Sequence, residues 1–173
     1  MELSALEKAA QGDRGELLGI IQSATQHLNQ TGVSQWDEVY PNAANVDEDL
    51  RNGQLYVVRA AGRIAGMVTL NQDCDPDYAN GKWQAEGPDF MVIHRLIVPP
   101  FMQGQGIGTQ MMQRIEAMLR GQGVQSIRLD AFAGNPHSLH LYEKTGYKIV
   151  GEAHWRKGHF YLMEKDIRGA DEA

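Results

Sequence analysis

Residues 92–119 read V-I-H-R-L-I-V-P-P-F-M-Q-G-Q-G-I-G-T-Q-M-M-Q-R-I-E-A-M-L. The branched, apolar run over residues 92–98 predicts a buried strand, which two prolines end. A turn with Gly104, Gly106 and Gly108 follows. Apolar residues at helical spacing then predict a helix: Met111, Met112, Ile115, Met118 and Leu119. Because the glycines leave the backbone uncovered where this helix begins, unpaired N–H groups and the positive end of the helix dipole face one space. The stretch therefore predicts a binding site for a phosphate group.

Two common phosphate-binding turns fit this stretch poorly. The mononucleotide P-loop ends in Gly-Lys-Ser/Thr, whereas Gly108 is followed by Thr109 and Gln110, so that turn is excluded. The dinucleotide fingerprint has its second and third glycines three residues apart, and here they are two apart. Asp130 stands about where that fingerprint needs an acidic residue, so this alternative stays open, as does a glycine turn that binds no ligand.

A third pattern, Q-x-x-G-x-G, is present as Gln103, Gly106 and Gly108. It is similar to the pyrophosphate-binding turn of the GNAT superfamily of acetyl-CoA-dependent N-acyltransferases. After a predicted strand over residues 126–132, the segment N-P-H-S-L-H-L-Y-E-K-T-G-Y (135–147) resembles a second signature of that superfamily. In this segment Asn135 is a good N-cap, proline stands at the first helical position, and Gly146 ends the helix. Both signatures occur in the order and separation of the superfamily.

The resemblance covers roughly residues 55–165 and extends loosely to the N-terminus, where a bacterial subgroup of small GNAT proteins is similar. It implies acetyl-CoA as co-substrate and a set of residues that contact it. The expected cofactor-binding residues are Leu96, Ile97, Val98, Gln103, Gly104, Gln105, Gly106, Ile107, Gly108, Thr109, Asn135 and Tyr142. Backbone N–H groups near residues 96–98 are expected to polarise the thioester carbonyl. Asn135 is expected to meet the pantetheine arm, and Tyr142 occupies the family's usual position for the general acid.

A base for the acceptor amine is harder to place. We expect His94, two residues before Leu96 on the strand, because its reference pKa suits this role. Asp37, Glu38, Asp89 and Asp130 are rivals for it. Four aromatic residues fall in the regions that usually build the acceptor pocket, and they could form either an aromatic wall or part of the core: Trp36, Tyr40, Tyr78 and Trp83.

Composition narrows the class of partner. The 173 residues suffice for one domain, which we expect over residues 1–168, followed by a short acidic tail, expected to be disordered, over residues 169–173. The net charge of −6 argues against nucleic acid as the main partner. No apolar run approaches a membrane span, no signal peptide is evident, and the single Cys74 fits a reducing cytoplasm. We expect a cytoplasmic protein, monomeric or homodimeric, that acts on a small-molecule amine or a peptide amine.

Two patterns suggestive of metal were considered and set aside. Asp73, Asp75 and Asp77 are spaced like the start of an EF-hand loop, but Tyr78 stands where that loop needs glycine. Histidines also occur in two pairs, on a predicted short helix and near the last predicted hairpin: His137, His140, His154 and His159. With no second cysteine and no fixed carboxylate spacing, they do not form a recognisable zinc motif. We therefore predict no metal.

The remaining chain predicts an α/β fold with a mixed, mostly antiparallel sheet and helices on both faces. Strands are expected over residues 2–8, 55–60, 64–70, 92–98, 126–132, 147–153 and 159–165. Helices are expected over residues 12–30, from a cap at Asn45 to Arg51, over residues 108–120, and after Asn135. Residues 71–89 are expected to form a long polar loop. The two signature-bearing strands, 92–98 and 126–132, should be parallel neighbours that splay apart, as the resemblance implies.

The function expected from this reading is N-acetylation of a primary amine by its direct attack on acetyl-CoA. Three alternatives stay open: acetylation of protein lysines or N-termini, a non-catalytic CoA-binding regulatory module, and a nicotinamide enzyme. Retention of Asn135 and Tyr142 favours an enzyme over a binding module.

Overall fold

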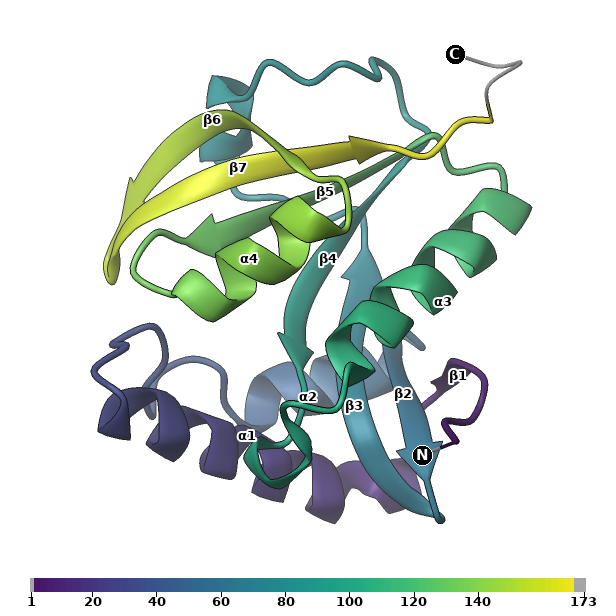
Figure 1. Ribbon diagram of the computed structural model, residues 1–173, viewed down its shortest axis with the longest axis vertical. Helices are drawn as coiled ribbons and strands as arrows, with labels where there is room; N and C mark the ends of the chain where they lie inside the picture. The colour runs from purple at the N-terminus through teal and green to yellow at the C-terminus, as the bar shows by residue number, and fades with distance from the viewer. Residues whose placement is uncertain (1, 170–173) are drawn as a thin grey trace. The chain divides into compact units, whose positions relative to one another are not determined.

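The computed structural model describes residues 2–169, and it alternates strands and helices along them (Figure 1). The strands are β1 (Glu7–Lys8), β2 (Leu55–Ala60), β3 (Arg63–Asn71), β4 (Phe90–Ile97), β5 (Ser126–Phe132), β6 (Lys148–Trp155) and β7 (Gly158–Asp166). The α-helices are α1 (Arg14–Gln30), α2 (Ala43–Arg51), α3 (Ile107–Gly121) and α4 (Pro136–Lys144). Three short 3-10 helices complete the elements: η1 (Gln11–Asp13), η2 (Pro76–Asn80) and η3 (Pro100–Met102).

The strands form one mixed sheet in the order β1-β2-β3-β4-β5-β7-β6. β4 and β5 run parallel, with Phe90 opposite Ser126 and Val92 opposite Arg128. The pairs β1–β2, β2–β3, β5–β7 and β6–β7 are antiparallel. The predicted mixed, mostly antiparallel sheet with a parallel pair at the two signature strands is therefore confirmed.

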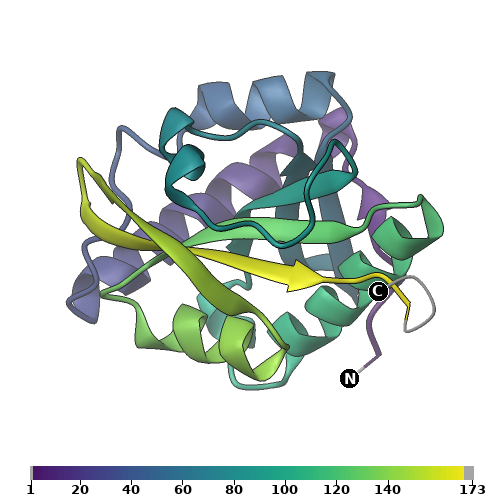
Figure 2. The same cartoon turned by 90° about the horizontal axis from the view of Figure 1, so that it is seen from above.

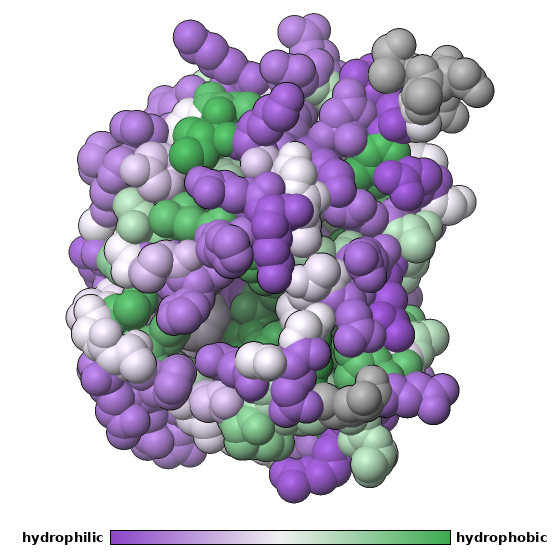
Figure 3. Space-filling view, in the orientation of Figure 1, coloured by the Kyte–Doolittle hydropathy of each residue, from purple (hydrophilic) through white to green (hydrophobic). Residues whose placement is uncertain are grey.

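The described chain divides into two compact units, and β4 and α3 each contribute to both. The first unit holds residues 2–70 and 94–114, and the second holds residues 71–93 and 115–169. Residues 170–173 of the predicted tail lie outside the described residues. Within the described part no helix has the length and hydrophobicity that a bilayer span requires, and the face drawn in Figure 3 mixes hydrophilic and hydrophobic side chains.

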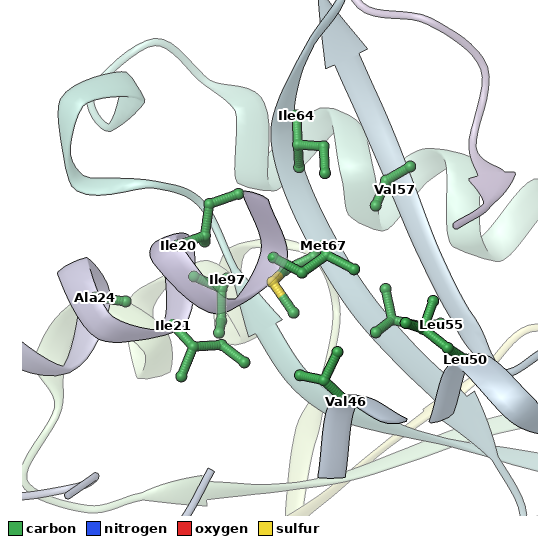
Figure 4. Close-up of a cluster of buried hydrophobic side chains, with 11 residues drawn as sticks. Ile20, Ile21, Ala24, Val46, Leu50, Leu55, Val57, Ile64, Met67 and Ile97 are labelled. Carbon is green, nitrogen blue, oxygen red and sulfur yellow. The ribbon is translucent and has the colours of Figure 1, made fainter. Parts of the chain in front are cut away.

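The core of the first unit forms between helix and strand side chains that point toward one another (Figure 4). The amphipathic spacing predicted for α1 buries four residues on one face: Leu17, Ile20, Ile21 and Ala24. They meet Val46 and Leu50 of α2, residues of β2 and β3, and Ile97 of β4. In β3 every residue after Arg63 is buried, which fits a sequence that is apolar except for Thr69 and Asn71 rather than an alternating one.

The second unit has its own small core under the hairpin that β6 and β7 form beside β5 (Figure 2). Tyr78, Val92, Ala153 and Leu162 are its buried members, and Trp83, Phe90, Val150 and Trp155 pack against them. The loop between β3 and β4 therefore supplies core residues, although its sequence is polar.

Several predicted bounds needed correction. The strand expected over residues 2–8 is only the two residues of β1. The cap of α2 is Asn42 rather than Asn45, because these two asparagines bond reciprocally: each backbone N–H donates to the other's side-chain oxygen, at 2.9 and 3.1 Å. The segment expected as a loop over residues 71–89 contains η2, which Asp75 caps by accepting from the N–H of Asp77 at 2.9 Å. In α3 the predicted apolar residues are buried except Met118, which is partly exposed.

Gly66 sets how closely β3 packs on α3 in the first unit. A β-carbon built on Gly66 would overlap the sulfur of Met111, which is fully buried, and would lie 3.3 Å from Val58 Cγ2. We predict that Gly66→Ala lowers the free energy of unfolding by about 1–3 kcal/mol, the usual cost of overpacking a core. Urea unfolding monitored by circular dichroism measures it.

The matched control is Gly19, which is exposed on α1 and has no atom within 4 Å of a built β-carbon. Gly19→Ala should raise the free energy of unfolding by about 0.5–1 kcal/mol, since alanine is the better helix former. Gly66→Ala should also cost less in a Met111→Ala background, because the overlapping sulfur is then gone. An equal cost in both backgrounds would show that the Met111 contact is not the cause.

Candidate active site

The glycine turn that precedes α3 is open on its outer side. Gly104 and Gly106 have φ of 80° and 76°, a left-handed conformation in which a side chain is strained. A β-carbon built on either glycine would meet no atom within 4 Å, and residues 103–106 are exposed. The N–H of Gln110 donates to the carbonyl of Gly106 at 3.2 Å, the first α-helical bond of this turn. The N–H groups of residues 107–109 precede that bond, so they fit an anion such as a pyrophosphate.

Gln103, the first residue of the Q-x-x-G-x-G pattern, ties the turn to the end of the preceding strand. Its side-chain amide donates to the carbonyl of Val98 at 3.1 Å. The glutamine side chain thus has a positioning role for the turn, and its backbone remains part of the predicted cofactor site.

β4 carries an irregularity at Arg95. Its φ of 51° places a non-glycine residue in the left-handed region, which breaks the regular alternation of N–H and C=O directions along the strand. The guanidinium donates to the carboxylate of Asp49 on α2 and, at 2.8 Å, to the hydroxyl of Tyr40. Thr69 of β3 donates to the same carboxylate at 2.8 Å. Four segments of the first unit therefore meet at one polar network, which is buried at Asp49 and Thr69 and exposed at Tyr40.

This network keeps a positive charge inside the first unit. Burial alone would lower the pKa of Arg95, but Tyr40 and Asp49 outweigh it, so the pKa is raised. Asp49 is 6% exposed, and the Arg95 guanidinium carbon also lies 5.6 Å from the centre of the Tyr40 ring. The guanidinium is therefore charged and held in one position next to residues 96–98, whose N–H groups are the predicted donors to the thioester carbonyl.

In the second unit, α4 presents the second signature. Asn135 is its N-cap as predicted: its side-chain oxygen accepts from the N–H of Ser138 at 3.2 Å, and Pro136 is the first helical residue. Tyr142 is buried in the last turn of this helix, and its ring lies 5.9 Å from that of Tyr147. The short capped helix therefore holds Asn135 and Tyr142 in a defined relation.

The environment of Tyr142 keeps its phenol protonated. Burial raises the pKa of Tyr142 well above its usual value, and the negative charge of Asp130 raises it further. A phenol in this state is uncharged at neutral pH and can donate a hydrogen bond.

Asp130 on β5 is the carboxylate that acts on Tyr142. Its side chain accepts a hydrogen bond from the hydroxyl of Tyr78 at 2.7 Å. Burial raises the pKa of Asp130, the bond from Tyr78 opposes this, and the charge of Asp75 adds to it. The residue nevertheless keeps part of its surface exposed. A partly accessible carboxyl group whose pKa is raised is suited to accept a proton.

The loop that carries Tyr78 and Trp83 is held by ring contacts and hydrogen bonds over residues 78–85. The Tyr78 and Trp83 rings stack with centres 5.4 Å apart, and Trp83 Nε1 donates to the carbonyl of Tyr78 at 2.7 Å. The Arg128 guanidinium lies 4.6 Å from the centre of the Trp83 ring. The carboxylate of Glu164 accepts from the N–H groups of residues 84 and 85 at 2.6 and 3.2 Å. Both predicted pocket residues of this unit are thus packed in place, and Tyr78 is bonded to Asp130.

The other predicted residues occupy the first unit. Trp36 is partly buried against its core, Tyr40 is 38% exposed at the Arg95 network, and His94 is half-buried on β4.

Of the rival bases, Asp37 accepts from the N–H groups of residues 39 and 40, which is a turn-forming role. Glu38 and Asp89 are exposed.

The sequence did not predict a role for two residues of this network, Arg95 and Asp49. The available signal for Arg95 was a charged side chain inside an otherwise apolar strand, where only a paired charge is tolerated. Asp49 offered no comparable signal, because an aspartate on a short helix is ordinarily exposed.

These features are those of a family of known proteins. Residues 21–147 match the model of the Acetyltransferase (GNAT) family, and the chain belongs to that family. It is an acetyl-CoA-dependent N-acyltransferase. The L-methionine sulfoximine/L-methionine sulfone acetyltransferase of Pseudomonas paraeruginosa is 28% identical over 153 residues, which cover 86% of this chain and 83% of that protein.

Solved structures share the fold. A GNAT-family acetyltransferase from Streptococcus agalactiae superposes with a TM-score of 0.85 at 22% identity, covering 96% of each chain. The PaiA N-acetyltransferase from Thermoplasma acidophilum, in complex with coenzyme A, has a TM-score of 0.71 at 15% identity and covers 96% of this chain and 99% of that one. The predicted GNAT-like fold is thereby confirmed.

The raised pKa of Asp130 has a consequence for stability. Because its pKa is higher in the folded state than in the unfolded chain, its favourable contribution is present at acidic pH and is lost as pH rises through the folded-state pKa. At neutral pH the ionised carboxylate therefore lowers the free energy of unfolding. We predict that Asp130→Asn raises the melting temperature by a few degrees at pH 8 and that this gain disappears near pH 3.5. Thermal unfolding at both pH values measures it.

Asp13 provides a control of opposite sign. Its hydrogen bond from Arg59, at 2.9 Å, lowers the pKa of Asp13, so its contribution is present at neutral pH and is lost as pH falls through the folded-state pKa. Asp13→Asn should therefore lower the melting temperature at pH 8. If Asp130→Asn also lowered the melting temperature at pH 8, ionised Asp130 would not destabilise the folded state as predicted.

Proposed function

We propose that the protein transfers an acetyl group from acetyl-CoA to a primary amine by direct attack of the amine. The observation that carries the proposal is the exposed turn at the start of α3, in which Gly104 and Gly106 are left-handed and nothing occupies the space beside them. A pyrophosphate needs such a turn: unpaired N–H groups, the positive end of a helix and no side chain in the way.

The residues assigned to acetyl-CoA follow from this anchor. The N–H groups of residues 103–109 would bind the pyrophosphate, and the backbone of residues 96–98 would run beside the pantetheine arm and polarise the thioester carbonyl. Asn135 would contact the arm's amides from α4. When bound, acetyl-CoA supplies the acyl group as a thioester.

The chemistry requires two proton movements. The amine nitrogen forms a bond to the carbonyl carbon, the carbon–sulfur bond breaks, the nitrogen loses a proton and the sulfur gains one. We propose that Tyr142, which its surroundings keep protonated, provides the proton for the sulfur. Reference pKa values near 8.5 for a thiol and 10 for tyrosine make full transfer uphill by about 2 kcal/mol, and burial adds to this. Tyr142 therefore acts mainly by hydrogen bonding while charge develops on sulfur.

For the amine's proton we propose Asp130 ahead of His94. Asp130 is partly exposed, its pKa is raised, and its charge acts on Tyr142, so it lies in the same electrostatic environment as the proposed acid. A carboxylate there also attracts the protonated form of the amine before deprotonation. His94 remains the alternative, and a pH–rate profile separates the two: Asp130→Asn should abolish the acidic limb of kcat/KM, and His94→Gln should leave it in place.

The acceptor we propose is a small amine of amino-acid size. The Pseudomonas relative named above acts on L-methionine sulfoximine and L-methionine sulfone, which are small amino acids, and this supports a small acceptor. A panel of amino acids, polyamines and lysine peptides, read as free thiol released from acetyl-CoA, tests it. Turnover of peptides alone would favour the protein-acetylating alternative, and no turnover of any amine would favour a non-catalytic CoA-binding module.

The glycine turn can be tested by affinity. We predict that Gly106→Ala raises the dissociation constant for coenzyme A by about tenfold or more, because the left-handed turn is strained and a methyl group enters the phosphate space. Isothermal titration calorimetry with coenzyme A measures it. Gly62 has φ of 79°, equally open surroundings and a place in the turn between β2 and β3, so Gly62→Ala carries the same backbone strain. An equal loss of coenzyme A affinity in both variants would show that the glycine turn does not bind the pyrophosphate.

The acid role of Tyr142 has a matched control in Tyr147, whose ring lies 5.9 Å from that of Tyr142. We predict that Tyr142→Phe lowers kcat by about tenfold to a thousandfold with little change in the dissociation constant for coenzyme A. Tyr147 is also buried, and within residues 2–169 its hydroxyl has no hydrogen-bond partner, so Tyr147→Phe should leave kcat unchanged. Full turnover by Tyr142→Phe in the thiol-release assay would show that another group protonates the sulfur.

A further inference from the structure

The hairpin of β6 and β7 gathers three potential metal ligands on one face. His154 lies directly opposite His159 across the two strands. Glu152 is two residues before His154 on the same strand, and residues two apart in a strand point to the same side of a sheet. One ligand atom from each of the three side chains lies within 4.8 Å of the other two. Neither the short helix signature nor the glycine turn includes any of them.

His159 has an unused nitrogen at this place. Its Nε2 is shielded from solvent and, within residues 2–169, accepts or donates no hydrogen bond. It lies 3.4 Å from Oε2 of Glu152, close enough for an ion pair but without the geometry of a hydrogen bond. A shielded polar atom without a hydrogen bond is costly, and coordination of a metal ion would satisfy it.

We propose that Glu152, His154 and His159 bind a divalent transition-metal ion, with Zn²⁺ as the ion that suits them best. Two imidazoles and one carboxylate are a common ligand set for zinc, in which a fourth position is left to water. Calcium and magnesium prefer oxygen ligands throughout, so two histidines select against them.

The distances fit a tetrahedral ion after small side-chain rotations. With bonds of about 2.0–2.1 Å, two ligand atoms of a tetrahedral zinc site are about 3.4 Å apart. The Glu152–His159 pair already has this separation. His154 and Glu152 are exposed, so their side chains can rotate without disturbing the core.

The surroundings hold His159 in place for this role. The ring of Tyr161 contacts it edge-on, with centres 4.8 Å apart. The exposed His154 ring stacks on that of His159 with centres 4.8 Å apart and an angle of 13°, and it would turn out of this stack so that both imidazoles point a nitrogen at one ion. A bound ion would join β6 to β7 beside the hairpin turn. The sequence placed His154 and His159 near one hairpin but gave no reason to add Glu152, because the three ligands become neighbours only when the two strands pair.

The test is a titration of tag-free protein with ZnCl₂ in a buffer without chelators, followed by calorimetry. We expect one Zn²⁺ per chain with a dissociation constant in the micromolar range. His154→Asn and Glu152→Gln should each weaken binding by about tenfold or more. Both residues are exposed, so both variants should fold, as circular dichroism would verify. Substitution by Co²⁺ should give the visible absorption of a four-coordinate ion.

The matched control is the double variant His137→Asn/His140→Asn, which removes two exposed histidines from α4 and should bind Zn²⁺ as the unchanged protein does. Absence of saturable binding would overturn the proposal. So would unchanged affinity in the His154 and Glu152 variants, or loss of binding in the control. Because the readout is metal binding alone, the result does not depend on whether the protein acetylates an amine.

Discussion

The buried ion pair between Arg95 and Asp49 is the central polar contact of the first unit. It joins α2 to β4 where the strand backbone turns left-handed, and Thr69 and Tyr40 complete its hydrogen bonds. Removing one partner of such a pair costs about 3–5 kcal/mol, because the other charge stays buried without compensation. The direction of the strand beyond Arg95, and through Gln103 the position of the glycine turn, depends on this pair.

In the second unit two ionisable groups, Tyr142 and Asp130, are coupled electrostatically. Burial keeps the Tyr142 phenol protonated, and the charge on Asp130 reinforces that state. Asp130 keeps part of its surface exposed, and its proposed role as the base depends on that exposure. Burial thus raises the pKa of both groups, and the phenol, whose ordinary pKa is already the higher of the two, stays protonated at neutral pH.

Local patterns predicted the signature elements well. The strand, glycine turn and helix of residues 92–119 and the Asn135 cap were correct because each depends on residues a few positions apart. The network at Arg95 joins residues 46 apart, and the Tyr78–Asp130 bond joins residues 52 apart. No local pattern encodes such pairs. The misplaced cap of α2 has a different cause: Asn42 and Asn45 are the same residue type and bond to each other, so the sequence offers two equal choices.

The loop between β3 and β4 also covers an edge strand of the sheet. β6 is the outermost strand on its side, and such strands can recruit a strand from another molecule. Here the N–H of Lys82 donates to the carbonyl of Val150 at 2.8 Å, and the side-chain amide of Asn80 donates to the backbone carbonyl of Glu152 at 3.3 Å. Gly151 admits this approach, since a β-carbon there would lie 2.9 Å from the Asn80 carbonyl oxygen. The segment that supplies Tyr78 and Trp83 therefore also protects the protein against self-association by strand addition.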